Sequence, residues 1–191
     1  MNGLFEAALE LHQFMEENHW RFCIIGGLAV VRWGQPRATQ DVDVSLLTDF
    51  GKEEDYVDAL LRRFEGRIPD AGRFAMENRV VLAKASKGVP LDISLAGFPF
   101  EVQVIDRASF FGFGPGVELR TASAEDLIVL KAFAGRDQDW ADVKGILERQ
   151  GDVLDWNYVR RELGALSELL EGADRLARLE EIRRKLDVES G

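Results

Sequence analysis

The sequence of 191 residues predicts an α+β fold, in which a mixed β-sheet with flanking helices is followed by a C-terminal helical part. Up to about residue 122, short apolar runs typical of strands alternate with amphipathic stretches typical of helices. Two of these runs are joined by Lys87-Gly88, which indicates a hairpin. From Ser123 onward the pattern is helical. We therefore expect an α/β core over residues 1–122 and a helical part over residues 123–191, packed on the core.

The first third of the chain is predicted to alternate helices with strands. Apolar residues at helical spacing favour the helices, and short apolar runs favour the strands. In chain order, the expected elements are a helix over 3–19, a strand over 22–25, a helix over 28–33, a strand over 41–47 and a helix over 53–64. Thr48 or Asp49 is expected to cap the last of these helices.

The rest of the chain is predicted to change from strands to helices. A break over 66–72 precedes the two strands of the hairpin, at 79–86 and 89–95. Ser123 begins a capping box at the start of the helical part. The other expected elements are a strand over 100–105, an aromatic and glycine-rich loop over 109–116, a strand over 117–121, and helices over 123–135, 136–150, 155–171 and 173–187.

Composition excludes several classes of protein. A formal net charge of −10 argues against binding of nucleic acid over a broad surface, which needs a basic footprint. No apolar stretch approaches the roughly 20 residues of a membrane span. The single cysteine, Cys23, lies in an apolar run and is expected to be a buried hydrophobic residue. The first residues lack the basic region of a signal peptide, so we expect a cytoplasmic protein.

The stretch from Gly26 to Asp43 contains the residues best suited to chemistry. Gly26-Gly27 follows an apolar run, and Asp41 and Asp43 begin the next one. Side chains of a strand alternate between faces, so the two carboxylates point the same way, about 7 Å apart along the strand. A glycine turn before a helix lets the backbone approach phosphates closely. Together these residues predict a seat for a divalent metal ion and a nucleoside triphosphate.

A third carboxylate completes the pattern that nucleotidyl transfer requires. Two divalent ions, usually Mg²⁺, bridge the triphosphate, the attacking oxygen and the leaving oxygen, and carboxylates hold such ions. Asp92, an acid between apolar neighbours of a predicted strand, is the candidate for metal ligand and general base. Asp106 is its competitor. Arg32 and Arg37 flank the loop before Asp41, and Arg37 is the better candidate for a phosphate contact.

These residues resemble the signature of a known superfamily. The spacing of fourteen residues from Gly27 to Asp41 is similar to that of the DNA polymerase beta-type nucleotidyltransferases. Within that superfamily, the run from Arg37 to Asp43 resembles the branch of the AbiEii-type toxins. A later segment, with Lys131 on a helix and then Arg136, Asp139 and Asp142, resembles a second motif of that branch. The resemblance covers roughly residues 20–150.

The resemblance implies a role for each matching residue. Asp41, Asp43 and Asp92 would be the catalytic, metal-binding carboxylates, Gly26 and Gly27 would take the phosphates, Lys131 would contribute charge to the triphosphate, and Asp139 and Asp142 would support the site. The fold implied is the mixed-sheet nucleotidyltransferase core. The activity implied is transfer of a nucleoside monophosphate from an NTP to an acceptor hydroxyl, with a two-metal Mg²⁺ site.

The acceptor and the partners stay open at this stage. The acceptor hydroxyl is that of an RNA such as the 3′ end of a tRNA, a protein side chain, or a small molecule of the aminoglycoside type. A toxin-like enzyme would have an antitoxin partner. The alternative is a non-catalytic module of the same fold that binds nucleotides or proteins. The aromatic cluster Phe110, Phe111 and Phe113 is suited to stacking on a base, and equally to packing in the core or against a partner.

Overall fold

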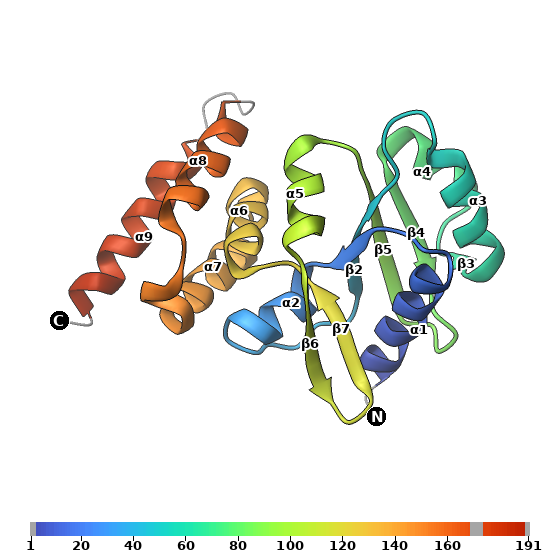
Figure 1. Ribbon diagram of the computed structural model, residues 1–191, viewed down its shortest axis with the longest axis horizontal. Coiled ribbons are helices and arrows are strands. Elements are labelled where there is room, and N and C mark those ends of the chain that lie inside the picture. The colour runs from blue at the N-terminus through green and yellow to red at the C-terminus, as the bar shows by residue number, and fades with distance from the viewer. Residues whose placement is uncertain (1–2, 169–173, 190–191) are drawn as a thin grey trace. The chain divides into compact units, whose positions relative to one another are not determined.

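The computed structural model describes residues 3–168 and 174–189. The chain divides into two compact units, each described here by itself. The first unit comprises Met1–Ala29 and Ala38–Ala122, and the second comprises Val30–Arg37 and Ser123–Gly191. The first unit therefore carries the sheet, and the second is helical (Figure 1).

Helices and strands alternate through the first unit. Helix α2 begins in this unit and ends in the second. The elements are α1 (Gly3–Glu17), β1 (Phe22–Ile24), α2 (Gly26–Trp33), β2 (Val42–Leu47), α3 (Glu53–Arg63), β3 (Glu65–Gly66), α4 (Ala71–Asn78), β4 (Val80–Lys84), β5 (Pro90–Ala96), α5 (Pro99–Arg107), β6 (Ser109–Gly114) and β7 (Val117–Thr121).

Within the described residues, seven strands form one sheet in the order β3-β4-β5-β2-β1-β7-β6. The pairs β2 with β5 and β1 with β7 are parallel, and the other neighbours are antiparallel. The expected mixed sheet is therefore confirmed, including the β4–β5 hairpin. The central pair, β2 with β5, brings together the strands on which the acidic residues were predicted.

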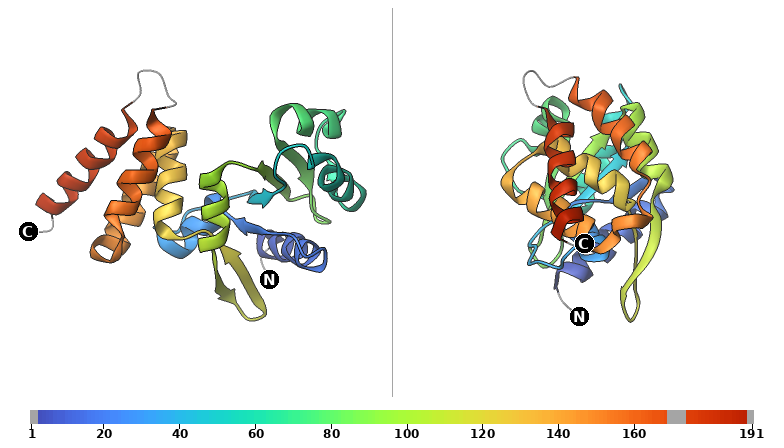
Figure 2. Two further views of the ribbon diagram at one scale, coloured as in Figure 1. Left: turned by 45° about the horizontal axis from the view of Figure 1, so that its top comes forward. Right: turned by 90° about the vertical axis from the view of Figure 1, so that its left-hand side faces the viewer.

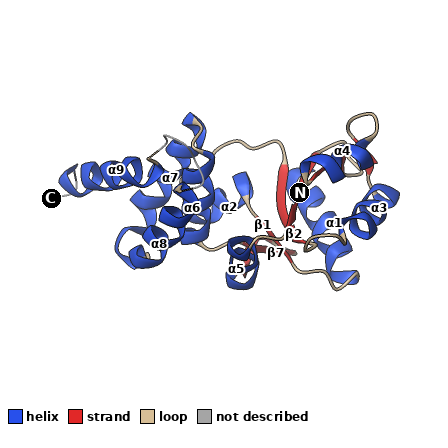
Figure 3. Ribbon diagram, turned by 90° about the horizontal axis from the view of Figure 1, so that it is seen from above, coloured by secondary structure: helices blue, strands red, loops and turns tan. Residues whose placement is uncertain are grey.

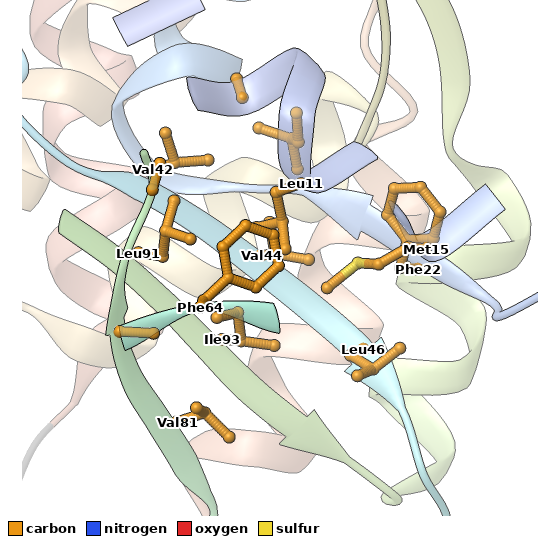
Figure 4. Close-up of a cluster of buried hydrophobic side chains, with 14 of the residues drawn as sticks. Leu11, Met15, Phe22, Val42, Val44, Leu46, Phe64, Val81, Leu91 and Ile93 are labelled. Atoms are coloured by element: carbon orange, nitrogen blue, oxygen red, sulfur yellow. The ribbon is translucent and has the colours of Figure 1, made fainter. Parts of the chain in front are cut away.

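The core of the first unit lies on one face of this sheet. Side chains of β4, of most of β5 and of the first three residues of β2 alternate between buried and partly exposed positions, so one face of these strands is apolar. Figure 4 shows this face packed against α1 and the segment after α3. The residues labelled there are Leu11, Met15, Phe22, Val42, Val44, Leu46, Phe64, Val81, Leu91 and Ile93. Their burial fixes which face the intervening polar residues occupy.

Two predictions about local structure are wrong. The apolar run over 100–105 is part of helix α5, whose first turn is capped by Glu101: its carboxylate accepts the backbone N–H groups of Gly97 (2.8 Å) and Phe98 (2.9 Å). A short apolar run fits a buried helix as well as a strand, and here the cap and Pro99 favour the helix. The loop expected over 109–116 is largely strand β6, because β7 lies alongside and pairs with it.

Two smaller differences concern α3 and α4. Helix α3 has Lys52 at its N-cap, without a capping side chain, rather than Thr48 or Asp49. Helix α4 occupies a segment for which no helix was expected.

The second unit is built from helices that pack on one another. Ser123 caps α6 as predicted, its hydroxyl oxygen accepting the N–H of Asp126 (3.1 Å), and Gly135 ends the helix with a φ of 66°. Helix α6 packs against α7 and against α8, which Figure 3 shows gathered around it, and Figure 2 shows the orange α8 beside the red α9. The elements are α6 (Ala124–Ala134), α7 (Asp137–Gln150), η1 (Gly151–Val153), α8 (Trp156–Ser167) and α9 (Arg175–Glu189). Among the described residues, no helix has the length and apolar character needed to cross a membrane.

Candidate active site

Three carboxylates from the first unit form one cluster, as the strand pattern predicts. Asp41 precedes β2, Asp43 is its second residue, and Asp92 lies on β5 in register with Asp43. Each residue offers a carboxylate oxygen, and the three oxygens lie within 4.8 Å of one another. All three residues are partly exposed. Residues between them, such as Val42, point into the core on the opposite face.

The glycine turn lies directly against this cluster. Gly26 has a φ of +60°, in the left-handed region that favours glycine, and it begins helix α2. A Cβ at Gly26 would lie 2.7 Å from the Cβ of Asp43 and closer still to its carboxylate. A Cβ at Gly27 would lie 2.7 Å from the Cβ of Thr39. Gly26 therefore allows the backbone to approach Asp43 closely, and Gly27 allows it to approach Thr39.

Thr39 is a supporting residue to which the sequence assigned no role. Its hydroxyl donates a hydrogen bond to Oδ1 of Asp41 (2.9 Å). This bond orients the first carboxylate of the pair from two residues upstream. The only signal in the sequence is the spacing Thr39-x-Asp41, which is too common to indicate the contact.

Arg67 is a second residue missing from the sequence prediction. Its guanidinium group contacts the carboxylate of Asp92 through Nη2 and Oδ1. Burial raises the pKa of Asp92, the charge of Arg67 opposes this, and the charge of Asp41 adds to it, so that the pKa of Asp92 lies above its ordinary value. Arg67 follows a two-residue strand and has no local sequence pattern that would point to this contact.

The donor set suits a hard divalent cation. Mg²⁺ takes oxygen ligands at about 2.0–2.1 Å, so two opposite ligands of one ion lie about 4 Å apart. Oxygens within 4.8 Å of one another need only a small adjustment to share one ion. This spacing is also compatible with two ions about 3.5–4 Å apart, as in a two-metal site. The three aspartates therefore fit such a group in number, chemistry and spacing.

Lys131 lies in the second unit, in a buried network of ion pairs. Its Nζ is 3.1 Å from Oδ1 of Asp139 and 2.8 Å from Oδ2 of Asp142. Arg37 holds Asp142 in a bidentate pair, with Nε at 2.7 Å and Nη2 at 2.9 Å. Arg136 pairs with Asp139 in the same way, at 2.6 and 3.1 Å. The contacts predicted between Arg37 or Lys131 and a triphosphate stay predictions.

The cations of this network control its carboxylates. Burial alone would raise the pKa of Asp142, but hydrogen bonds from Arg37 and Lys131 outweigh burial and hold the pKa below its ordinary value. The pKa of Asp139 is lowered in the same way, with Arg136 and Lys131 outweighing burial. Both acids are thereby kept charged inside the second unit, and their immediate contacts explain the later sequence motif.

The other candidates lie apart from the acidic cluster or on the surface. Asp106 lies on helix α5 rather than on a strand, and its exposed carboxylate contacts Arg21. Phe110 and Phe111 are exposed on β6, whereas Phe113 packs on Phe5 with ring centroids 5.6 Å apart. Cys23 is buried as expected.

Comparisons with known proteins identify a family and similar folds. Residues 2–187 match the model of the family described as "Nucleotidyltransferase of unknown function (DUF6036)". No curated protein matches the chain. An antigenic nucleotidyltransferase-like protein from Paracoccidioides brasiliensis has a similar fold, with a TM-score of 0.53 and 17% identity over 92% of this chain and 91% of that one. ANT(2″)-Ia in complex with adenylyl-2″-tobramycin gives a TM-score of 0.54 and 16% identity over 85% and 97%. At these identities the two likenesses show the fold alone.

Proposed function

The chain belongs to the DUF6036 family of nucleotidyltransferases, and we propose that it transfers a nucleoside monophosphate from an NTP to an acceptor hydroxyl at Asp41, Asp43 and Asp92. The observation that carries the proposal is the convergence of three carboxylates beside the glycine turn at Gly26. Divalent ions bound there would neutralise the triphosphate and activate the attacking hydroxyl.

Each residue of the cluster has a distinct part in the proposed reaction. Asp41, which Thr39 orients, and Asp43 would hold the ion that accompanies the triphosphate. Asp92, on the neighbouring strand, would accept the proton of the attacking hydroxyl as its oxygen bonds to the α-phosphorus and pyrophosphate leaves. The turn at Gly26 and the first N–H groups of α2 favour the negative charge of the phosphates.

The test is transfer of label from radiolabelled NTPs in the presence of Mg²⁺ or Mn²⁺. RNA, protein and aminoglycosides are offered separately as acceptors. Asp43→Asn should lower the rate about a thousandfold, equivalent to about 4 kcal/mol of lost transition-state stabilisation. Asp106→Asn, an exposed carboxylate on α5, is the matched control and should leave the rate unchanged. Equal activity of Asp43→Asn and the unchanged protein would refute the proposal.

The acceptor class is the open part of this proposal. The likeness of fold to ANT(2″)-Ia, whose structure contains adenylyl-2″-tobramycin, favours including small antibiotics among the acceptors. The AbiEii-type branch, an RNA acceptor and an antitoxin partner stay predictions from sequence resemblance. Absence of labelled product with every acceptor, together with intact metal-dependent NTP binding, would favour the non-catalytic alternative.

A further inference from the structure

Arg67 lies in line with the acidic cluster although it is distant in sequence. Its backbone N–H donates to the carbonyl oxygen of Leu82 (2.9 Å), which continues the antiparallel pairing of β3 with β4. Leu82 is in register with Asp92, and Asp92 is in register with Asp43. Residues in register share a face of the sheet, so one row of side chains runs from Arg67 to the cluster. Figure 1 shows these strands side by side.

The contacts of Arg67 distinguish it from a structural arginine. Within the described part of the chain, its guanidinium contacts Asp92, whereas its buried Nε has no hydrogen-bond partner. Arg79, in the same unit, contacts Glu53 and donates to the carbonyl oxygens of Leu95 and Asp49. Several acceptors hold Arg79 in place, but Arg67 is anchored through a single carboxylate. Its position therefore depends on the charge of the cluster.

The negative charge of the acidic cluster explains why a cation is favourable at the position of Arg67. Three carboxylates with oxygens within 4.8 Å repel one another when charged, and their formal charge is −3. Arg67 reduces the summed charge of the four side chains to −2. It also attracts Asp92 against the repulsion from Asp41, which belongs to the same cluster. In this way a side chain supplies part of the neutralisation that a second divalent ion would supply.

We propose that Arg67 is a positioning residue that acts as a resident cation at Asp92 and weakens binding of free divalent ions to the nucleotide-free site. This inference rests on the proposed function, because it assumes that the three aspartates hold metal. Its consequence is that an ion bound to a triphosphate, whose own negative charge compensates for Arg67, is favoured over an ion taken up alone. The residue thereby links metal entry to nucleotide entry.

The test is titration of the nucleotide-free protein with Mn²⁺. Electron paramagnetic resonance measures the concentration of free Mn²⁺ at each step. The neutral variants of Arg67 remove one positive charge about 6 Å from the divalent ion. At a dielectric constant close to that of water, this should tighten Mn²⁺ binding about tenfold. Arg67→Gln and Arg67→Met should both show this gain. Arg67→Lys keeps the charge and should bind Mn²⁺ within about twofold of the unchanged protein. Arg73→Gln, which removes an exposed cation paired with Glu77, is the control and should have no effect.

The outcomes distinguish a failure of the proposed role of Arg67 from a failure of the proposed metal site. Local damage to the fold would weaken Mn²⁺ binding, so a gain in affinity cannot arise from misfolding. Unchanged or weaker binding in both neutral Arg67 variants would overturn the role of Arg67. Asp43→Asn is measured in the same series. If it leaves Mn²⁺ binding unchanged, the metal site itself, and with it the proposed function, fails.

Discussion

Gly26→Ala is the sharpest test of how the glycine turn builds the site. Alanine at a φ of +60° costs about 1–2 kcal/mol of stability from backbone strain alone. Its Cβ would also lie 2.7 Å from the Cβ of Asp43, against 3.4 Å for ordinary contact, a deficit of 3.4 − 2.7 = 0.7 Å. Rotation of the Asp43 side chain does not move its Cβ. The backbone of β2 or of the turn must therefore shift by about this distance.

The expected result is a loss of both stability and activity. Overpacking adds about 1–3 kcal/mol to the strain, so Gly26→Ala should destabilise the protein by about 2–5 kcal/mol. A misplacement of about 1 Å near reacting groups costs about a hundredfold in rate. We expect at least about a tenfold loss of nucleotidyl transfer and weaker Mn²⁺ binding. Unfolding in urea, label transfer and Mn²⁺ titration measure the three quantities.

The matched control for this prediction is Gly51→Ala. Gly51 also has a positive φ, of +82°, but among the described residues no atom outside its chain neighbours lies within 4 Å of the position its Cβ would take. This variant should show the strain of about 1–2 kcal/mol without any loss of turnover or metal binding. If Gly26→Ala resembles Gly51→Ala in all three measurements, the close approach of the turn to Asp43 has no functional meaning and the reasoning is refuted.

Two further predictions concern the ion-pair network of the second unit. Lys131→Met leaves Asp139 and Asp142 without their buried cation and should destabilise the protein by about 3 kcal/mol in urea unfolding. Lys144→Met, which removes an exposed pair with Glu148, should cost less than about 1 kcal/mol, and equal losses would contradict the assignment. The second prediction follows from the lowered pKa values of Asp139 and Asp142. Their stabilisation is complete above the unfolded pKa of about 3.9 and is lost as the pH falls through the lower folded pKa values, so stability should drop below about pH 4. Lys131→Met should show a shallower drop, and an identical drop in both proteins would refute the coupling.

Sequence predicts the parts of the site that a single segment determines. Alternation along β2 is enough to align Asp41 with Asp43 and to send Val42 to the core. It does not determine which strand lies beside β2. The adjacency of Asp92 depends on β5 pairing in parallel with β2, and the contact of Arg67 depends on two further strands being in register. These positions are set by the sheet as a whole.

Both wrong predictions concern segments with a weak local preference. The run from Phe100 to Ile105 is apolar enough for a strand, and only its cap at Glu101 distinguishes it as a helix. The aromatic segment of β6 has glycine content typical of a loop, and pairing with β7 makes it a strand. The first segment is therefore decided by a local cap that apolar periodicity does not register, and the second by pairing with a neighbouring strand.

The two acidic clusters of the chain use the same side chains in opposite electrostatic settings. In the second unit, Asp139 and Asp142 are buried and surrounded by cations that lower their pKa values, so their charge is already neutralised by the protein. In the first unit, Asp92 has a raised pKa and shares its surroundings with the carboxylates of Asp41 and Asp43. Burial is the main cause of the raised pKa of Asp92, and the charge of Asp41 adds to it against Arg67. The protein therefore neutralises this cluster only in part, and perturbation of this kind is typical of functional sites. This incomplete neutralisation, rather than the number of acids, supports the proposal that metal-dependent chemistry occurs at the first cluster and that the second has a structural role.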